Sequence, residues 1–418
     1  MITDASPPVP PSVQHAVYIA FLFAFGSCIG SFLNVVVWRL PRGESLVTPP
    51  SHCPKCNHPL AWYDNVPVLG WIMLAGRCRY CRGGISIRYP IIEGITGLLF
   101  AGYYVLLFIA RLGPRVYPMS SPLWWGFGSM TTLADDWPTY ALYMMLLAGL
   151  LAISLIDAEL FIIPIEIPWL MAGIALVVHT VWSGVSRPGA LDVSYIGAAL
   201  ATGGAAGLLI SLALRFTGVF ALSFPDGEPM LEVERQEIEA EINLARREGR
   251  EPDPDLKLPP RFTRRMVHAE IRKEIMFLLP PIVLAIGCLI LSSQWLAAEN
   301  FFRRAAATPW SSGLLGSILG LLAGGLIIWL IRIAGTLVLG KVAMGLGDVH
   351  LLAAIGAVLG AGPAIVTFFV APFFGLIVAL YALITGRHRE IPYGPYLSLA
   401  AAVAMLFYCP IYAYFVRV

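Results

Sequence analysis

Charged residues are scarce in this chain, and their scarcity decides its class. Asp, Glu, Lys and Arg make up 13% of the 418 residues, about half the roughly 25% of an ordinary soluble domain. Hydrophobic residues make up 58%, far more than a soluble domain carries. The net charge is only +2, so the chain has no overall signature for binding nucleic acid. The composition predicts a polytopic membrane protein.

Internal repeats, low-complexity tracts and a basic N-terminus are also lacking. The starting stretch MITDASPPVPPSVQH contains no Lys or Arg, whereas a secretory signal peptide has a basic region before its apolar core. We therefore expect the first apolar segment to be a retained membrane anchor.

Long apolar segments recur along the chain, and each approaches the ~20 residues that cross ~30 Å of hydrocarbon as a helix. We expect an all-α fold, a polytopic membrane helix bundle with a small zinc-binding cytosolic loop. The ten expected membrane helices lie at residues 16–37, 90–110, 139–156, 165–183, 193–214, 276–293, 313–339, 349–361, 364–385 and 393–416.

Lys and Arg gather on one side of these expected helices. With the N-terminus outside, the connecting segments on the inner side carry 21 basic residues and those on the outer side six. Because basic loops stay in the cytoplasm, the inner side is predicted to be cytosolic. The expected parts are an outside N-terminus with the first span (1–37), a cytosolic zinc-binding loop (38–89), membrane helices (90–214), a charged cytosolic insertion (215–275) and further membrane helices (276–418).

Four of the seven cysteines lie in the loop 38–89. Cys53 and Cys56 form one C-x-x-C pair, and Cys78 and Cys81 form a second one, with 21 residues between the two pairs. This spacing is typical of zinc ribbons, in which four thiolates hold one Zn²⁺. Disulfides are disfavoured on a cytosolic face, and a loop of this size needs a staple to fold. The loop is predicted to hold a structural zinc, with His52 and His58 as less favoured substitutes.

The segment 215–275 is rich in both signs of charge. It carries 13 Asp and Glu against 11 Lys and Arg, which is too acidic for a nucleic-acid patch. Charge pairs at helical spacing favour a helix over about 228–248. A solvated arm with little order is the alternative.

Two acids interrupt the apolar pattern at helix ends. Asp157 follows the third expected span, and Asp348 opens the eighth beside Gly345 and Gly347. Both fall on the expected cytosolic side. Ionisable groups in membrane helices are costly and usually functional, and two nearby carboxylates share a proton. This is the chemistry of an aspartic protease, in which one carboxylate takes a proton from water and the other donates one to the scissile carbonyl.

Other interpretations remain at this stage. Acids at helix ends can simply lie in the headgroup zone, as is expected for Glu159 and Glu166, although Glu159 is also a candidate modulator of Asp157. His350 faces the site or the interface, and Arg332 is expected to snorkel. An ion-coupled transporter would use the two aspartates as a proton relay, but it favours acids near the midplane and related halves. A catalytically idle zinc-bearing assembly factor would not need Asp348.

Six stretches of the chain resemble the type IV prepilin leader peptidase family, in that family's order. They are GSFLNVVVWRLP (30–41), HCPKCNHPLAWYDNVPVLGW (52–71), CRYCRGGISIRYPIIE (78–93), LIDAELFIIP (155–164), GLGDVHLLAAIGAVLG (345–360) and IPYGPYLSLAA (391–401). The resemblance covers roughly the first 180 and the last 80 residues.

The resemblance implies an enzyme of the inner (cytoplasmic) membrane with Asp157 and Asp348 as the catalytic pair. Its substrates would be prepilins or pseudopilins, cut at the cytoplasmic face, and S-adenosylmethionine would be the methyl donor if the new N-terminus is methylated. Membrane lipid would be the other partner. The chain departs from the family pattern where His350 replaces the usual Lys and Ile165 replaces the usual Asp. It is also longer, mainly between the two acid motifs.

Overall fold

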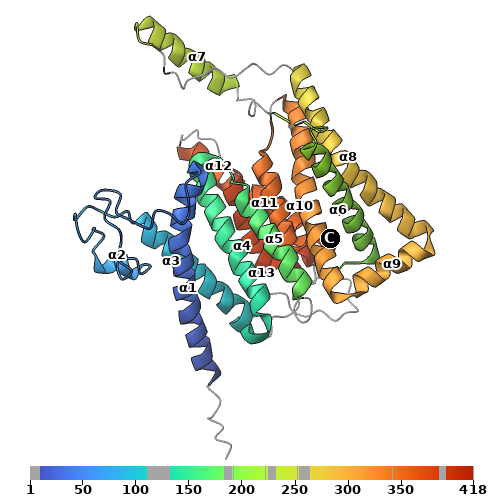
Figure 1. Ribbon diagram of the computed structural model, residues 1–418, viewed down its shortest axis with the longest axis horizontal. Coiled ribbons are helices and arrows are strands. Elements are labelled where there is room, and N and C mark those ends of the chain that lie inside the picture. The colour runs from blue at the N-terminus through green and yellow to red at the C-terminus, as the bar shows by residue number, and fades with distance from the viewer. Residues whose placement is uncertain are drawn as a thin grey trace, which may run out of the picture.

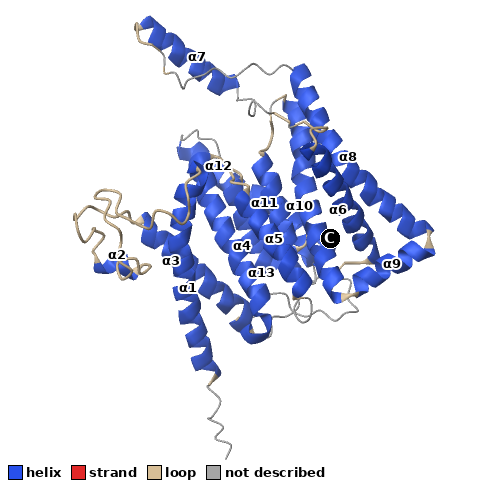
Figure 2. Ribbon diagram, in the orientation of Figure 1, coloured by secondary structure: helices blue, strands red, loops and turns tan. Residues whose placement is uncertain are grey.

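The computed structural model describes residues 10–110, 132–182, 191, 193–221, 223–224, 232–251, 253, 264–340, 342–385 and 392–417. These residues form an all-helical bundle, and none of them lies in a β-strand (Figure 2). The loop after the first helix contains two isolated β-bridges. The predicted all-α class is therefore confirmed. Several residues used to predict orientation, such as Lys341 and Arg387, lie outside the described ranges.

Each of the ten expected membrane segments coincides with a helix. These helices are α1 (Pro11–Arg39), α3 (Arg88–Tyr104), α4 (Leu133–Leu160), α5 (Glu166–Val181), α6 (Tyr195–Phe216), α8 (Arg264–Gln294), α10 (Pro309–Leu339), α11 (Leu346–Leu359), α12 (Ala361–Thr385) and α13 (Gly394–Arg417). Among the described residues, seven helices are long and apolar enough to cross a membrane, and α5, α11 and α13 are shorter apolar helices in their described parts. The chain is a multi-pass membrane protein.

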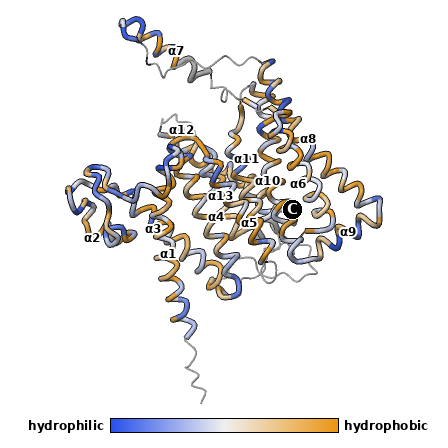
Figure 3. Tube along the Cα trace, in the orientation of Figure 1, coloured by the Kyte–Doolittle hydropathy of each residue, from blue (hydrophilic) through white to orange (hydrophobic). Residues whose placement is uncertain are grey.

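Within the described residues, five further helical pieces lie outside these ten. The short turn Leu40–Arg42 ends α1, α2 (Leu69–Met73) lies in the cysteine-rich loop, and a π-helical turn (Val105–Ile109) extends α3. The charged segment contains α7 (Glu232–Arg247), as predicted, although residues 228–231 lie outside the described ranges. Both α7 and the cysteine-rich loop are hydrophilic and project from the apolar bundle (Figure 3).

An additional helix, α9 (Leu296–Ala307), connects α8 to α10 and was not predicted from the sequence. It is amphipathic, with Phe302 buried and Arg303 and Arg304 exposed. Its Arg303 guanidinium lies 4.4 Å from the ring centre of Tyr195 on α6. In Figure 1 it lies at the end of the bundle opposite α7. These contacts fix the turn between two long helices.

Close backbone packing sets the position of α11. A Cβ atom on Gly320 of α10 would lie 1.9 Å from the carbonyl oxygen of Gly356 on α11, so only glycine permits this approach. Gly207 of α6 plays the same part against α8, where a Cβ would lie 2.3 Å from the Pro280 carbonyl oxygen. Small residues at such crossings let van der Waals contact hold membrane helices together. The helix that carries Asp348 is therefore held rigidly against α10.

The two aspartates, the cysteine-rich loop and α7 lie toward the same end of the bundle. In Figure 1, α1 and α4 run upward to this end, α11 starts downward from it, and α7 lies above it. The cysteine-rich loop lies beside the upper half of α1. Asp157 and Asp348 both belong to this end, which we call the aspartate end.

Candidate active site and metal centre

Asp157 lies in the last turn of α4, just before the chain turns away. Phe161 follows the helix with a left-handed φ of 56°, and its N–H donates to the Asp157 carbonyl at 3.0 Å. The side chain is 6% exposed, and its Oδ2 accepts a hydrogen bond from the Gly394 N–H at 2.9 Å. Because Gly394 is the first residue of α13, this bond joins the ends of two helices that are distant in the sequence.

Asp348 lies in the first turn of α11, with Gly345 as the N-cap residue. A carboxylate in a first turn is stabilised by the partial positive charge of the helix N-terminus. The residue before it, Gly347, packs against the loop that leaves α4, where a Cβ would lie 2.7 Å from the Ile163 Cβ. The segment that carries Asp348 therefore lies directly against the loop that follows Asp157.

The start of α13 connects the two acids. Gly394 donates to Asp157, and its neighbour Tyr393 lies within electrostatic range of Asp348. A Cβ on Gly394 would lie 2.6 Å from Oδ2 of Asp157, so a larger residue would displace that carboxylate. The start of α13 therefore contacts Asp157 directly, and Gly347 places the segment of Asp348 against the loop that follows Asp157.

Sequence reasoning assigned no role to Tyr393 or Gly394. The signal was present, because both lie in the stretch IPYGPYLSLAA that carries part of the family resemblance, although Ile391 itself lies outside the described residues. A tyrosine and a glycine before a proline are common at a helix start, so the pattern alone did not indicate contact with an acid.

The other polar candidates have different partners. Glu159 forms an ion pair with Arg88 of α3, with 2.5 Å between its Oε1 and the arginine Nη1. The His350 ring lies 5.6 Å from the ring centre of Trp169 on α5. Glu166 is the first residue of α5.

The snorkelling expected for Arg332 is wrong. Its side chain is 1% exposed, and its Nε lies 3.2 Å from Oε1 of Glu274 on α8. Because the buried carboxylate of Glu274, 58 residues away in sequence, pairs with the guanidinium, Arg332 does not need to extend to the membrane interface. The sequence could not reveal this pairing, because it depends on how α8 packs beside α10.

The four cysteines meet as predicted. Their Sγ atoms all lie within 4.8 Å of one another, and those of Cys53 and Cys81 are 3.8 Å apart. Four thiolates at about 2.3 Å from a tetrahedral Zn²⁺ are themselves about 3.8 Å apart, so the donor set fits zinc. A backbone N–H from Lys55 lowers the pKa of the Cys53 thiol to about 6, while burial and the neighbouring thiols raise the pKa of the Cys56 thiol to about 11.

The two cysteine pairs have the same backbone geometry. Cys53 N–H donates to the carbonyl of His58, and Cys78 N–H donates to that of Gly83. The histidines beside the first pair are otherwise engaged, since His52 Nδ1 lies 3.0 Å from the Pro50 carbonyl oxygen and the His58 ring lies 3.6 Å from that of Tyr80. The thiols alone form the cluster.

An ion pair between a half-exposed arginine and a buried aspartate holds the loop between the two cysteine pairs. Arg79 Nε lies 3.0 Å from both carboxylate oxygens of Asp64, and Nη2 lies 2.6 Å from one of them. The bidentate guanidinium holds the pKa of the Asp64 carboxyl below its usual value. This loop is therefore stabilised by an ion pair in addition to the four clustered thiols.

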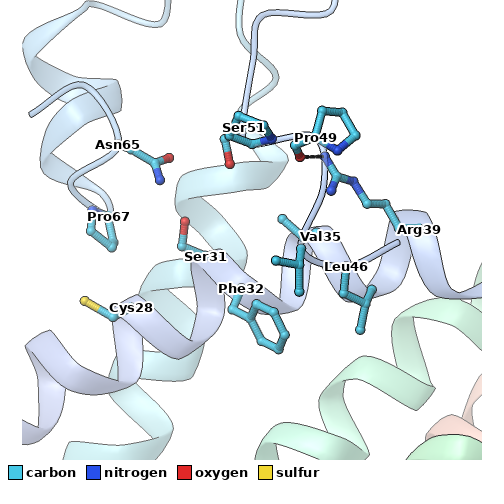
Figure 4. A pocket seen from close by; sticks show the side chains of 12 residues that line it. Cys28, Ser31, Phe32, Val35, Arg39, Leu46, Pro49, Ser51, Asn65 and Pro67 are labelled. Atoms are coloured by element: carbon cyan, nitrogen blue, oxygen red, sulfur yellow. Dashed lines mark hydrogen bonds between the residues drawn. The ribbon is translucent and has the colours of Figure 1, made fainter. Parts of the chain in front are cut away.

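A pocket of about 370 Å³ lies between α1 and the cysteine-rich loop (Figure 4). Cys28, Ser31 and Phe32 line it from α1, and Asn65 and Pro67 line it from the loop. Neither aspartate lines it, so the pocket is separate from the acid site.

We expect purified protein to contain about one Zn²⁺ per chain, because four thiolates saturate one tetrahedral site. The double variant Cys53→Ser, Cys56→Ser should lose this metal, as measured by elemental analysis. The variant Cys28→Ser is the matched control, since Cys28 is an exposed thiol outside the cluster. Unchanged zinc content in the double variant would contradict the assignment.

Two family models match the chain. One, described as the bacterial peptidase A24 N-terminal domain, matches residues 24–107 and includes the four clustered cysteines. The other, described as the type IV leader peptidase family, matches residues 276–380 and includes Asp348. Asp157 lies between the two matched regions.

Curated proteins named prepilin leader peptidase/N-methyltransferase are similar to parts of the chain. The one from Myxococcus xanthus (strain DK1622) is 38% identical over 168 residues, which are 40% of this chain and 42% of that protein. The one from Klebsiella pneumoniae is 47% identical over 102 residues, or 22% of this chain and 45% of that protein. The one from Aeromonas hydrophila is 32% identical over 183 residues, or 38% and 54%.

The chain spans about half the length of these curated relatives. No solved structure matches it.

Proposed function

We propose that this chain, which belongs to the type IV leader peptidase family, is a membrane-embedded aspartic endopeptidase. Asp157 and Asp348 are its catalytic pair. The observation that carries the proposal is that both buried acids lie at helix ends beside one loop: the Gly394 N–H binds Asp157, and the residue before Asp348 packs against the loop that follows Asp157.

The proposed mechanism needs one ionised and one protonated carboxyl group. Two close carboxylates do not both ionise easily, so they hold one proton between them. The ionised group takes a proton from water as it attacks the peptide carbonyl, and the protonated group donates to the carbonyl oxygen. The Gly394 N–H fixes Oδ2 of Asp157 during these transfers. Gly345 carries no side chain beside Asp348 and so leaves room for a substrate backbone, whereas Gly347 permits the close packing against Ile163.

The proposed substrates are prepilins or pseudopilins, cut at the cytoplasmic face of the inner membrane. Support comes from the names of the relatives and from the basic residues in the segments expected on the inner side. On this proposal the aspartate end, the zinc loop (38–89) and the insertion (215–275) are cytosolic, and the helices of 90–214 and 276–418 each contribute one acid. Nucleic acid is not an expected partner, and membrane lipid surrounds the bundle.

A second activity, methylation of the new N-terminus, is proposed from the relatives' names. S-adenosylmethionine would supply the methyl group. The binding residues for this cofactor are not assigned.

The transporter interpretation is not favoured. Both family models describe peptidases, and the two acids lie at helix ends, in the last turn of α4 and the first turn of α11, rather than near the midplane.

The test is incubation of the purified chain with a prepilin in detergent. The proposal predicts a shorter product on a gel. It also predicts that, after addition of S-adenosylmethionine, mass spectrometry of this product shows one added methyl group. An intact prepilin after incubation with folded, zinc-loaded protein would contradict the peptidase proposal. An unmethylated product would contradict only the second activity.

Deletion of residues 228–255 should leave cleavage of a simple prepilin largely intact. In the described structure, α7 projects away from the bundle and both aspartates lie elsewhere (Figure 1). The measurement is the cleavage rate of the deletion protein at equal membrane insertion. Complete loss of cleavage by a stably inserted deletion protein would show that this segment takes part in the reaction.

A further inference from the structure

A buried charged pair lies between α8 and α10, outside the proposed catalytic pair. Glu274 and Arg332 have side chains that are 2% and 1% exposed. The carboxylate has a partner at each oxygen, because Arg332 Nε lies 3.2 Å from Oε1 and Trp329 Nε1 donates to Oε2 at 3.0 Å. Ionisable residues in membrane helices are expensive, so this arrangement calls for a function beyond packing.

The same arginine holds the segment that leads to Asp348. Its Nη1 donates a hydrogen bond to the carbonyl oxygen of Met344, the residue before Gly345. One position earlier, the Ala343 N–H donates to Thr336 Oγ1 at 3.2 Å. The side chains of Arg332 and Thr336 both belong to α10. They fix the adjacent residues Ala343 and Met344 to that helix immediately before α11 begins.

The base of the charged insertion reaches the same place. The Phe224 N–H donates to Oε2 of Glu270 at 2.7 Å, one helical turn before Glu274 on α8. The Arg332 guanidinium lies 5.6 Å from the centre of the Phe224 ring. The pair therefore lies where the insertion, α8, α10 and the segment before Asp348 meet.

We propose that Glu274 and Arg332 are positioning residues for the acid site. Glu274 holds the guanidinium, the guanidinium holds the Met344 carbonyl, and this contact sets the direction in which Gly345, Gly347 and Asp348 enter α11. The inference rests on the proposed peptidase function, and it adds two residues that touch neither water nor substrate.

A purely structural pair and a positioning pair respond differently to removal of both charges. Replacing a buried ion pair by apolar residues of similar size is often neutral or stabilising, whereas removing one partner leaves an uncompensated charge. The double variant Glu274→Met, Arg332→Met should therefore fold. It leaves the Met344 carbonyl without its donor, and a misplacement of about 1 Å can cost on the order of 10²-fold in rate.

The experiment compares this double variant with wild type in thermal unfolding, membrane insertion and prepilin cleavage. We expect a melting temperature close to wild type, an unchanged KM, and a kcat lower by roughly 10- to 100-fold. A control is Glu299→Met, Arg303→Met, which removes a more exposed ion pair on α9, at the other end of the bundle, and should leave kcat unchanged. A well-folded Glu274→Met, Arg332→Met protein with wild-type kcat would overturn the proposal.

If the double variant does not insert, Arg332→Lys decides the question. Lysine keeps the charge opposite Glu274 but lacks the planar fork that reaches the carboxylate and the carbonyl together. We expect this variant to insert, with a lower kcat at unchanged KM. Wild-type kcat in Arg332→Lys would count against a positioning role.

Amide hydrogen exchange separates this proposal from the peptidase proposal. In Arg332→Lys, amide exchange at residues 343–348 should be faster than in wild type, while exchange in α6 stays unchanged. The same is expected of the double variant if it inserts. This readout needs no cleavage, so it remains decisive if wild-type protein cleaves no prepilin. Unchanged exchange at 343–348 would show that the pair does not hold the segment.

Discussion

Asp157→Asn and Asp348→Asn should each abolish prepilin cleavage. The amide is nearly isosteric with the carboxyl group, but it cannot take up or release the proton that the reaction needs. General acid–base groups contribute on the order of 10²- to 10⁴-fold each, so we expect a loss of at least about 10²-fold in kcat. The measurement is product formation on a gel at equal amounts of inserted protein.

Glu159→Gln is the matched control for these variants. Glu159 lies two residues after Asp157 on the same helix, but it is half exposed and pairs with Arg88. Exposed ion pairs contribute only about 0–1 kcal/mol, so this change should affect cleavage little. A loss as large as that of Asp157→Asn would mean that the charge of this helix end, and not one carboxyl group, is what matters.

Gly394→Ala should lower cleavage by roughly 10²-fold. The new Cβ would lie 2.6 Å from Oδ2 of Asp157, closer than nonbonded atoms approach, so the carboxylate must move. Alanine also stabilises most helices relative to glycine, so the fold itself should tolerate the change. The measurement is kcat and KM for prepilin cleavage at equal membrane insertion.

Gly173→Ala on α5 is the control for this substitution, because a Cβ there meets no atom within 4 Å. It should retain wild-type kcat. If Gly394→Ala also retained it, the bond between the Gly394 N–H and Asp157 would not be needed for the reaction.

Apolar runs were sufficient to predict the membrane helices. The bilayer forces every backbone polar group to find its partner within the segment, so an apolar run of sufficient length has few alternatives to a helix. The runs at 349–361 and 393–416, for example, became α11 and α13. The cysteine cluster was equally predictable, because two C-x-x-C pairs at ribbon spacing have few other uses.

Contacts between distant helices were not predictable. The bond from Gly394 to Asp157 joins residues 237 apart, and the pair of Glu274 and Arg332 joins residues 58 apart. Periodicity says which residues share a face of one helix, but not which face of another helix they meet. Sequence alone does not reveal that Glu274 pairs with Arg332, so Arg332 could not be distinguished from an arginine that extends to the membrane interface.

The helix α9 was missed for a different reason. LAAENFFRRAAA is short, and its apolar residues are too few to indicate a membrane span. A helix that lies between two long helices depends on its neighbours for stability, and short helices are marginal in isolation.

The central claim, that the two aspartates form one proteolytic unit, is tested most directly by the double variant Asp157→Asn, Asp348→Asn. Residual cleavage of a prepilin by wild type, both single variants and the double variant is measured by mass spectrometry at equal membrane insertion. Groups that act as a unit are non-additive, so the double variant should cleave no more slowly than either single variant. Substantial cleavage by either inserted single variant, or a double variant whose loss is the product of the two single losses, would contradict the account.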